Sequence, residues 1–381
     1  MVFKYVTGLL AKSTKLPFSF AIHSEDGESI PIGGDEHVFD LYIRNQAGLK
    51  AIKSLNELKV AESYIRGDID IEGDFIKALS LRHAFSDRNI LIKNWRRIAP
   101  ILFGRERLNP QWIAKHYDLN NIQLTFIDAD YHTYTPGIYE SEETSLEAGA
   151  ELKLDTAFQS LRLKPGDSVL DIGCGWGGFL RFAERKKVQV TGITLSRDQK
   201  QYVDDLIKEN NFNAKVMYQD LFSFQPSKKY DGIVLMGVLE DLSDYQRVMD
   251  QLPSLVKPGG RIYMDFAVAK KSFHTSSFTT KYVWPGTFRA VYMPQFIDAI
   301  RKSPFEIVAL YNDRRNYYLW SKKGLERWVQ KKEDVIKQTS EALWRTFRLL
   351  LAGVANGMSS PSHLLSAYRM ILELPEDTPT A

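Results

Sequence analysis

The sequence predicts an α/β protein with a doubly wound, mostly parallel sheet and a smaller N-terminal α+β domain before it. Strands and helices alternate from about residue 156 onward, which requires a parallel sheet covered by helices on both faces. The chain changes character near residues 105–115, and its 381 residues are enough for two domains of ordinary size. We therefore place one domain at residues 1–108 and a larger one at residues 109–381.

The larger domain is predicted from short apolar runs that alternate with helical patterns. The predicted strands are 168–172, 188–194, 214–219, 230–236 and 260–267. The predicted helices are 179–186, 197–210 and 245–255, and a late helical stretch covers 322–355. This order of elements gives the βαβ units of a parallel sheet.

The smaller domain has weaker signals. Residues 39–43 form a predicted strand, and residues 45–53 a turn and the element after it. Residues 58–75 begin as a helix and end in a turn rich in Gly and Asp, and residues 75–85 form another helix.

A basic and aromatic run closes the smaller domain and has two interpretations. Lys93, Arg96 and Arg97 interrupt apolar residues, which is typical of a solvated helix face. The same run is also compatible with a membrane-docking patch, in which Trp95 and Phe103 enter the interface and the arginines meet phosphates.

Composition and charge exclude several classes of protein. Hydrophobic residues make up 44% of the chain and charged residues 25%, and the net charge of +3 is too small to argue for a nucleic-acid partner. No stretch has the roughly 18 apolar residues needed to span a bilayer, and no signal peptide is evident. The single cysteine, Cys174, precludes an intrachain disulfide. These features predict a cytoplasmic protein that reaches any lipid from the membrane surface.

The strongest motif is the glycine-rich stretch at residues 169–178, VLDIGCGWGG. Gly173 and Gly175 allow a sharp turn and a close ligand, and Gly177 and Gly178 allow tight packing of the following helix. A dinucleotide such as NAD is the competing ligand, but Asp171 at the strand end favours a cationic one. The motif therefore predicts S-adenosylmethionine (SAM), which has no phosphates and a positively charged methionine end.

The next two strands supply further candidate contacts to this cofactor. Thr194, Leu195 and Gln199 follow the second strand, where many methyltransferases bind the ribose, and Ser196 is a candidate N-cap for the next helix. The third strand ends in Gln219 and Asp220, whose carboxylate could accept a hydrogen bond from the adenine amino group. No CxxC, HExxH or GxSxG motif is present, so no metal site and no serine nucleophile are expected.

Together these residues resemble the cyclopropane fatty acid synthases and their mycolic acid methyltransferase relatives. The resemblance runs from about residue 58 to the late 360s. It includes the segments AESYIRG (61–67), HYDLNN (116–121), LDIGCGWGG (170–178), GITLS (192–196) and KYVWPG (281–286).

This resemblance implies transfer of a methyl group from SAM to the cis double bond of an unsaturated phospholipid acyl chain. Loss of a proton from the resulting carbocation then closes a ring, and in the family a bound bicarbonate takes that proton. The N-terminal domain is expected to meet the membrane or a partner protein. The enzyme would work in the cytoplasm, at the inner face of the membrane, and the family also allows a homodimer.

The candidate catalytic residues are those that correspond to the family's bicarbonate ligands. Glu240 is retained, Asp265 stands where the family has a histidine, and Tyr317 is matched to its tyrosine. Pro136 replaces a cysteine in the segment 134–139, from which Tyr134 is a predicted cofactor contact. Aromatic candidates near the reacting carbon are Tyr139, Phe278, Tyr282, Trp284 and Tyr317.

Two neighbouring carboxylates would repel bicarbonate, so we do not expect that anion to bind. Glu240 or Asp265 would then be the base itself, or the enzyme would methylate a different alkene or give a product without a ring. Two further alternatives stay open, namely a methyltransferase of small molecules and a SAM-binding partner subunit without activity.

Overall fold

The computed structural model describes residues 8, 17–87, 130–133, 135–242, 244–270, 276–284, 289–359 and 365–377. The chain forms two compact units. The first comprises Met1–Ile98, Ser276–Val283 and Ser321–Gly357, and the second Ala99–Thr275, Trp284–Trp320 and Met358–Ala381. The predicted boundary at residues 108 and 109 lies outside the described residues, as do the basic run at 93–103 and the segment 116–121. The two-domain division therefore stays a prediction. In the structure, the first unit also includes two segments from late in the chain, 276–283 and 321–357.

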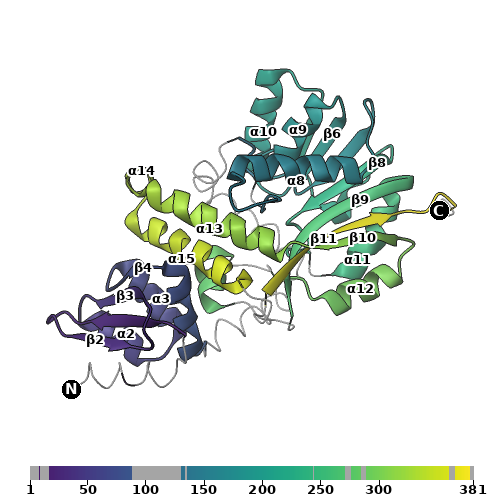
Figure 1. Ribbon diagram of the computed structural model, residues 1–381. Coiled ribbons are helices and arrows are strands. Elements are labelled where there is room, and N and C mark those ends of the chain that lie inside the picture. The colour runs from purple at the N-terminus through teal and green to yellow at the C-terminus, as the bar shows by residue number, and fades with distance from the viewer. Residues whose placement is uncertain are drawn as a thin grey trace. The chain divides into compact units, whose positions relative to one another are not determined.

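The first unit contains a four-stranded sheet in the order β2-β1-β3-β4 (Figure 1). Its strands are β1 (Ser19–His23), β2 (Ser29–Ile32), β3 (His37–Ile43) and β4 (Ile69–Gly73). Its first helices are α2 (Gln46–Lys53), α3 (Glu57–Arg66), α4 (Phe75–Ala78) and the 3₁₀ helix η1 (Leu79–Ala84). Phe20 and Phe39 stack in the core with ring centroids 4.8 Å apart.

One local expectation for this unit was wrong, and another was confirmed in a modified form. The stretch that ends at Gly73 is a strand and not a turn, because Ile69 and Ile71 alternate with acidic residues and pair with β3. The predicted helix at residues 75–85 is a short α-helix followed by a 3₁₀ helix.

The late helical stretch consists of three helices, α13 (Arg314–Gln330), α14 (Lys332–Gln338) and α15 (Glu341–Met358). Two reciprocal hydrogen bonds join α13 to α15: the Trp328 indole donates to the Trp344 carbonyl at 2.9 Å, and the Trp344 indole to the Trp328 carbonyl at 3.2 Å. Arg345 of α15 contacts Asp70 of β4 at 3.3 Å, which places α15 on the first unit's sheet.

The second unit contains a seven-stranded sheet in the order β10-β11-β9-β8-β5-β6-β7. Its strands are β5 (Ser168–Ile172), β6 (Gln189–Thr194), β7 (Lys215–Tyr218), β8 (Tyr230–Met236), β9 (Val256–Ala269), β10 (Glu306–Asn312) and β11 (Leu365–Glu373). β5 to β9 are parallel, and β11 runs antiparallel to both β9 and β10. The predicted doubly wound, mostly parallel fold is confirmed, although β10 and β11 were not predicted.

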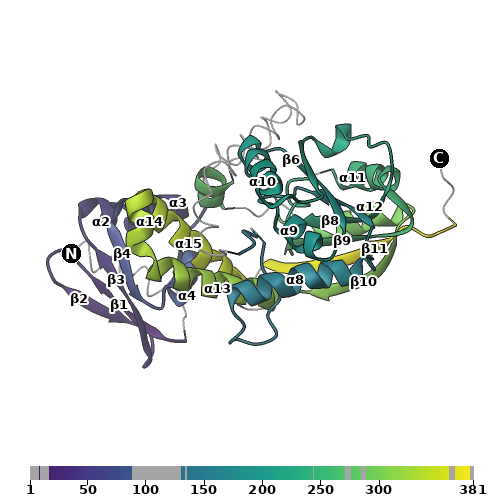
Figure 2. The ribbon, with the colours of Figure 1, turned by 90° about the horizontal axis from the view of Figure 1, so that it is seen from above.

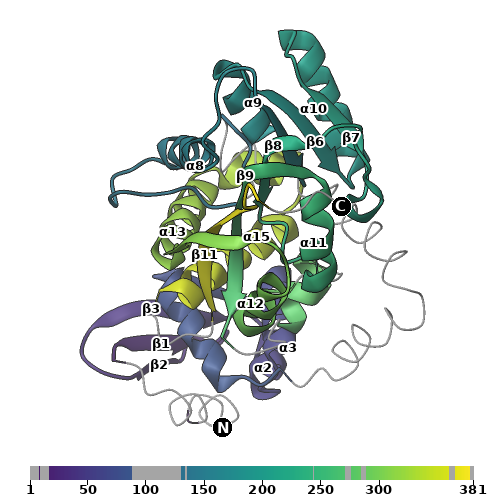
Figure 3. The same ribbon diagram turned by 90° about the vertical axis from the view of Figure 1, so that its right-hand side faces the viewer.

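Helices cover both faces of this sheet (Figures 2 and 3). One face holds α8 (Leu146–Ser160), α9 (Gly178–Arg185) and α10 (Arg197–Asn210), and the other α11 (Tyr245–Gln251) and α12 (Met293–Arg301). Side chains alternate between the faces: Val169 packs with the α8 group, whereas Leu170 and Ile172 pack with the α11 group. By the same alternation Asp171 of β5 and Asp265 of β9 point toward α8.

None of the helices in the described residues is long and apolar enough to cross a membrane.

Candidate active site

The glycine-rich loop after β5 is held in one conformation by the neighbouring strand. The backbone amides of Gly173 and Cys174 both donate to the carbonyl of Ile193 in β6, at 2.9 and 3.1 Å. Gly173 has φ of +71°, and a Cβ there would lie 2.5 Å from Val238 Cγ2. Glycine is therefore required at this position for both its backbone conformation and its lack of a side chain.

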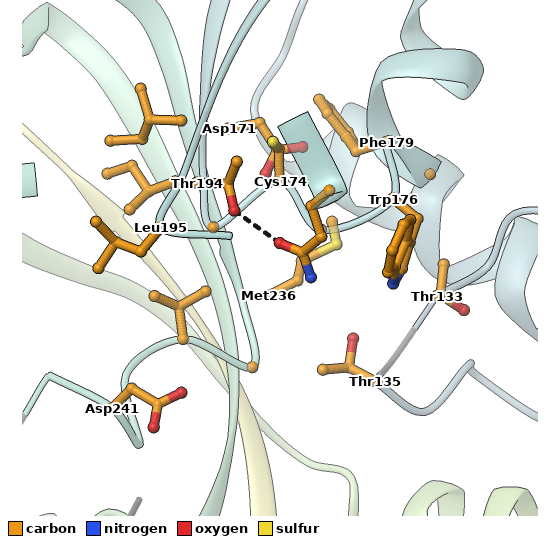
Figure 4. A pocket seen from close by; sticks show the side chains of 18 of the residues that line it. Thr133, Thr135, Asp171, Cys174, Trp176, Phe179, Thr194, Leu195, Met236 and Asp241 are labelled. Atoms are coloured by element: carbon orange, nitrogen blue, oxygen red, sulfur yellow. Dashed lines mark hydrogen bonds between the residues drawn. The ribbon is translucent and has the colours of Figure 1, made fainter. Parts of the chain in front are cut away.

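A pocket opens at this end of the sheet, and all of the described residues that line it belong to the second unit (Figure 4). Its empty volume, including the part open to solvent, is about 1030 Å³. Eight predicted cofactor contacts line it: Asp171, Gly173, Gly175, Thr194, Leu195, Gln199, Gln219 and Asp220. Gly177 does not line the pocket but precedes α9 as its N-cap, and Tyr134 lies outside the described residues.

Polar side chains from two strand ends are already oriented in this pocket. The Thr194 hydroxyl donates to Gln199 Oε1 at 2.6 Å, shown by the dashed line in Figure 4. Because its side-chain oxygen accepts from Thr194, Gln199 can donate a hydrogen bond to a ligand from its side-chain NH2 group. Ser196 caps α10 by accepting the Gln199 N–H, and Asp220 accepts the Phe222 N–H at 2.9 Å.

Two buried carboxyl groups border the pocket from different sides. Asp171 and Asp241 are 4% and 8% exposed, and in Figure 4 Asp241 lies well away from Asp171 and Cys174. Burial raises the pKa of Asp171 to about 7, against the attraction of the Lys153 ammonium, and burial also raises the pKa of Asp241 to about 7. A cation in the pocket would favour the ionised form of both groups.

Lys153 connects the pocket to Asp265, which lies behind the pocket wall. Its side chain is fully buried, and Nζ donates to the carbonyl and hydroxyl oxygens of Thr135. The same Nζ lies 3.4 Å from Asp265 Oδ2. The backbone carbonyl of Asp265 accepts the N–H of Gly237, which lines the pocket.

Glu240 and Tyr317 complete this buried cluster. Glu240 Oε1 accepts the Ala267 N–H at 2.7 Å, while Oε2 has no hydrogen-bond partner among the described residues. Burial, together with the negative charges of Asp265 and Asp241, raises the pKa of Glu240 to about 8. Burial and the charges of Glu240 and Asp265 raise the pKa of Tyr317 far above its usual value. The structure thus brings together all three predicted catalytic residues, whose roles remain predictions.

The aromatic candidates near the reacting carbon are divided between the two units. Tyr139 belongs to the second unit, where its backbone N–H donates to Asn316 Oδ1 at 3.0 Å. Phe278 and Tyr282 belong to the first unit, where the Tyr282 hydroxyl donates to Glu62 at 3.0 Å.

Sequence reasoning missed Lys153, Thr135 and Asp241 as parts of the site. Lys153 stands in an ordinary helical pattern, where a lysine is usually solvated. Asp241 adjoins Glu240 in sequence and was considered only as a departure from the family pattern. Apolar wall residues such as Trp176 and Met236 carry no signal beyond being hydrophobic.

The fold and the pocket define a class of protein, the SAM-dependent methyltransferases. The comparison with known families narrows this class: the mycolic acid cyclopropane synthetase model matches residues 105–364, more than half of the chain. The chain therefore belongs to the mycolic acid cyclopropane synthetase family and is a SAM-dependent methyltransferase, which confirms the resemblance drawn from the motifs.

Individual relatives agree with this assignment. A probable fatty acid methyltransferase of Mycobacterium tuberculosis is 27% identical over 66% of this chain and 68% of its own length. A sphingolipid C9-methyltransferase of Candida albicans is 25% identical over 81% of this chain and 64% of its own length. The chain thus matches about two thirds of the length of these relatives.

The fold is shared with solved structures of the family. The mycolic acid cyclopropane synthase CmaA1, solved with S-adenosylhomocysteine and CTAB, superposes with a TM-score of 0.63 at 21% identity. That alignment covers 69% of this chain and 97% of the other.

The residues present fit SAM, so the predicted cofactor is confirmed. Asp171 and Asp241 suit its positive charges, and the Thr194–Gln199 pair suits its hydroxyl groups. Trp176, Leu195 and Leu221 give the pocket apolar surface of the kind that suits an adenine ring.

Proposed function

We propose that this enzyme transfers the methyl group of SAM to the cis double bond of an unsaturated acyl chain in a membrane lipid, a phospholipid in the first instance. The observation that supports this most directly is the buried cluster of Glu240, Asp265 and Tyr317 next to the pocket. The names of the relatives support it too, because they include methyltransferases of fatty acids and of sphingolipids.

The cluster suits the charge that develops during methylation of an alkene. When bound, SAM supplies the methyl group as an electrophile, and the π electrons of the alkene form the new C–C bond. A positive charge then develops on the second alkene carbon, and buried carboxylates stabilise a cation strongly in a site that excludes water. Glu240 and Asp265 are the candidates for this role and for removal of the proton that completes the reaction.

The place of action follows from the substrate. An acyl chain reaches the pocket only from a bilayer or from a carrier, so we place the enzyme transiently at a membrane surface. Co-sedimentation of the protein with phospholipid vesicles tests this step separately from the chemistry.

The deciding experiment supplies methyl-labelled SAM and vesicles of mono-unsaturated phospholipid, without added bicarbonate. We expect a gain of one CH2 unit per modified acyl chain in the mass spectrum, and NMR of the product then tells a ring from a methyl branch. Vesicles of fully saturated phospholipid are the control and should gain no label.

Parallel vesicles that contain unsaturated ceramide test a sphingolipid acceptor. Label in the ceramide alone would show that the acceptor is a sphingolipid and not a phospholipid. No labelled lipid in any arm, with SAM binding confirmed by calorimetry, would contradict the proposed function.

A further inference from the structure

Lys153 of α8 is a fully buried lysine that contacts an acidic side chain beside the pocket. It is 2% exposed, and its Nζ lies 3.4 Å from Asp265 Oδ2. A buried ammonium is costly unless anions and hydrogen-bond acceptors surround it. Thr135 supplies two acceptors and Asp265 supplies the negative charge. Contacts with these two residues therefore fix the position of Nζ.

The other charged and titratable groups near Asp265 come from each neighbouring element. They are Glu240 after β8, Tyr263 of β9, Asp313 before α13, Tyr317 of α13 and Arg369 of β11. Arg369 is the only cation among these five, and its Nη1 lies 3.5 Å from Asp313 Oδ1. The charge of Arg369 therefore acts on Asp313 as well as on Asp265, whereas among the described residues Lys153 is the cation that forms an ion pair with Asp265.

Glu240 has a different environment from Asp265. Its Oε1 accepts one backbone N–H, and within the described residues no lysine or arginine forms an ion pair with it. Burial raises the pKa of both carboxyl groups, but the Lys153 ammonium acts against that rise at Asp265 only. Environments that differ in this way push the pKa values of the two carboxyl groups apart, as an acid and base pair requires.

We propose that Lys153 is a positioning residue that keeps Asp265 ionised while Glu240 stays protonated, so that Asp265 is the proton acceptor of the methylation reaction. This inference rests on the proposed function, because it assigns the final proton of that reaction. It chooses between the two carboxyl groups that the sequence left equivalent.

The proton transfer balances without any further reactant. Methyl transfer breaks the S–CH3 bond, whose electrons remain on sulfur, and leaves a carbocation in the acyl chain. A C–H bond next to the cationic carbon, or in the new methyl group, then breaks. Its electron pair forms the new double bond or the ring bond, and the proton binds to an oxygen of Asp265. Before the next turnover Asp265 loses this proton through the pocket that Lys153 lines, because both of its carboxyl oxygens are buried.

The first test needs no turnover. Infrared spectra of the protein near neutral pH report protonated carboxyl groups by their C=O stretching band. We expect Glu240→Gln to remove a protonated band from the wild-type spectrum and Asp265→Asn to remove none. In Lys153→Met an additional protonated band should appear that Asp265→Asn abolishes, separate from any change at Asp171, which the same ammonium attracts. A protonated Asp265 in the wild type would overturn the assignment.

The second test uses the pH profile of kcat/KM for vesicle lipid at saturating SAM, so that the pH dependence of SAM binding does not enter the profile. Loss of the Lys153 ammonium raises the pKa of Asp265. In Lys153→Met the acid limb of the profile, where activity rises with pH as the base ionises, should therefore move to higher pH. Activity near neutral pH should fall roughly 10- to 100-fold, within the range that proton transfer contributes, and recover as pH rises. Lys153→Arg keeps the charge and should restore the position of the limb. A uniform loss of activity at every pH would show a purely structural role and overturn the inference.

Two controls complete the design. Lys186→Met removes a lysine that pairs with Asp155 at the protein surface, at 3.3 Å, and should change neither the spectrum nor the profile. At saturating SAM, kcat of the double variant Lys153→Met with Asp265→Asn should be no lower than that of Asp265→Asn alone, because the attraction of Lys153 to Asp171 then affects only SAM binding. If the wild type methylates no lipid, the proposed function and the acceptor role fall together. The infrared result then still decides which carboxyl group is ionised.

Discussion

Asp171 and Asp241 are acidic residues whose pKa values burial raises into the physiological pH range. Each has its pKa raised to about 7. Each also borders the pocket that takes a cofactor with two positive charges, so binding and ionisation are linked.

This linkage gives a pH dependence for SAM binding. The ionised carboxylates attract the cofactor and the protonated ones do not, so SAM affinity should fall as pH drops through 7. We expect a loss of about 3- to 30-fold between about pH 8 and pH 6, because one pKa unit corresponds to about 1.4 kcal/mol. Isothermal titration calorimetry at several pH values measures this.

The matched variants are Asp241→Asn and, as a surface control, Asp155→Asn. Asp241→Asn should weaken SAM binding near neutral pH and flatten its pH dependence, whereas Asp155→Asn should behave as the wild type. An affinity that is independent of pH in the wild type would show that neither carboxyl group titrates on binding.

At the scale of elements, the connection from β5 to α9 depends on two glycines with similar backbones and different surroundings. Gly173 has φ of +71° and Gly175 has φ of +53°, both in the left-handed region. An added Cβ would meet Val238 at 2.5 Å at Gly173 and nothing within 4 Å at Gly175.

We expect Gly173→Ala to be the more damaging of the two alanine substitutions. The left-handed conformation costs each variant about 1–2 kcal/mol, and Gly173→Ala adds about 1–3 kcal/mol for the steric clash. Urea unfolding without ligand measures the difference, and titration with SAM should show the larger loss of affinity in Gly173→Ala. Equal losses in both variants would mean that Val238 moves aside freely.

At the scale of the whole molecule, the cofactor pocket belongs to one of the two compact units. The lining residues that the structure describes all lie in the second unit, whereas Phe39 is 1% exposed in the core of the first. Phe39→Ala should therefore lower the free energy of unfolding by about 3–5 kcal/mol. The Kd for SAM should stay within twofold of the wild type in the folded protein. Circular dichroism and calorimetry measure the two quantities, and a large change in Kd would show that the first unit contributes to binding.

The local sequence was sufficient to predict the doubly wound sheet and the glycine-rich loop. Apolar runs such as 168–172, followed by glycines and a helical pattern, specify a strand, a turn and a helix whatever surrounds them. The strand ends that carry Asp171, Thr194 and Gln219 were also located, since strands in a βαβ unit end at the same edge of a sheet. β10 and β11 were missed because antiparallel strands at one end of the sheet lie outside the repeated βαβ pattern.

By itself, the sequence determined the family, the cofactor loop and the candidate trio Glu240, Asp265 and Tyr317. Only the tertiary structure decided that α8 lies against the sheet with Lys153 turned toward Asp265, 112 positions further along the chain. The physical reason is that periodicity reports which face of an element is buried, whereas a carboxyl group is ionised or neutral according to the charges that distant segments bring beside it.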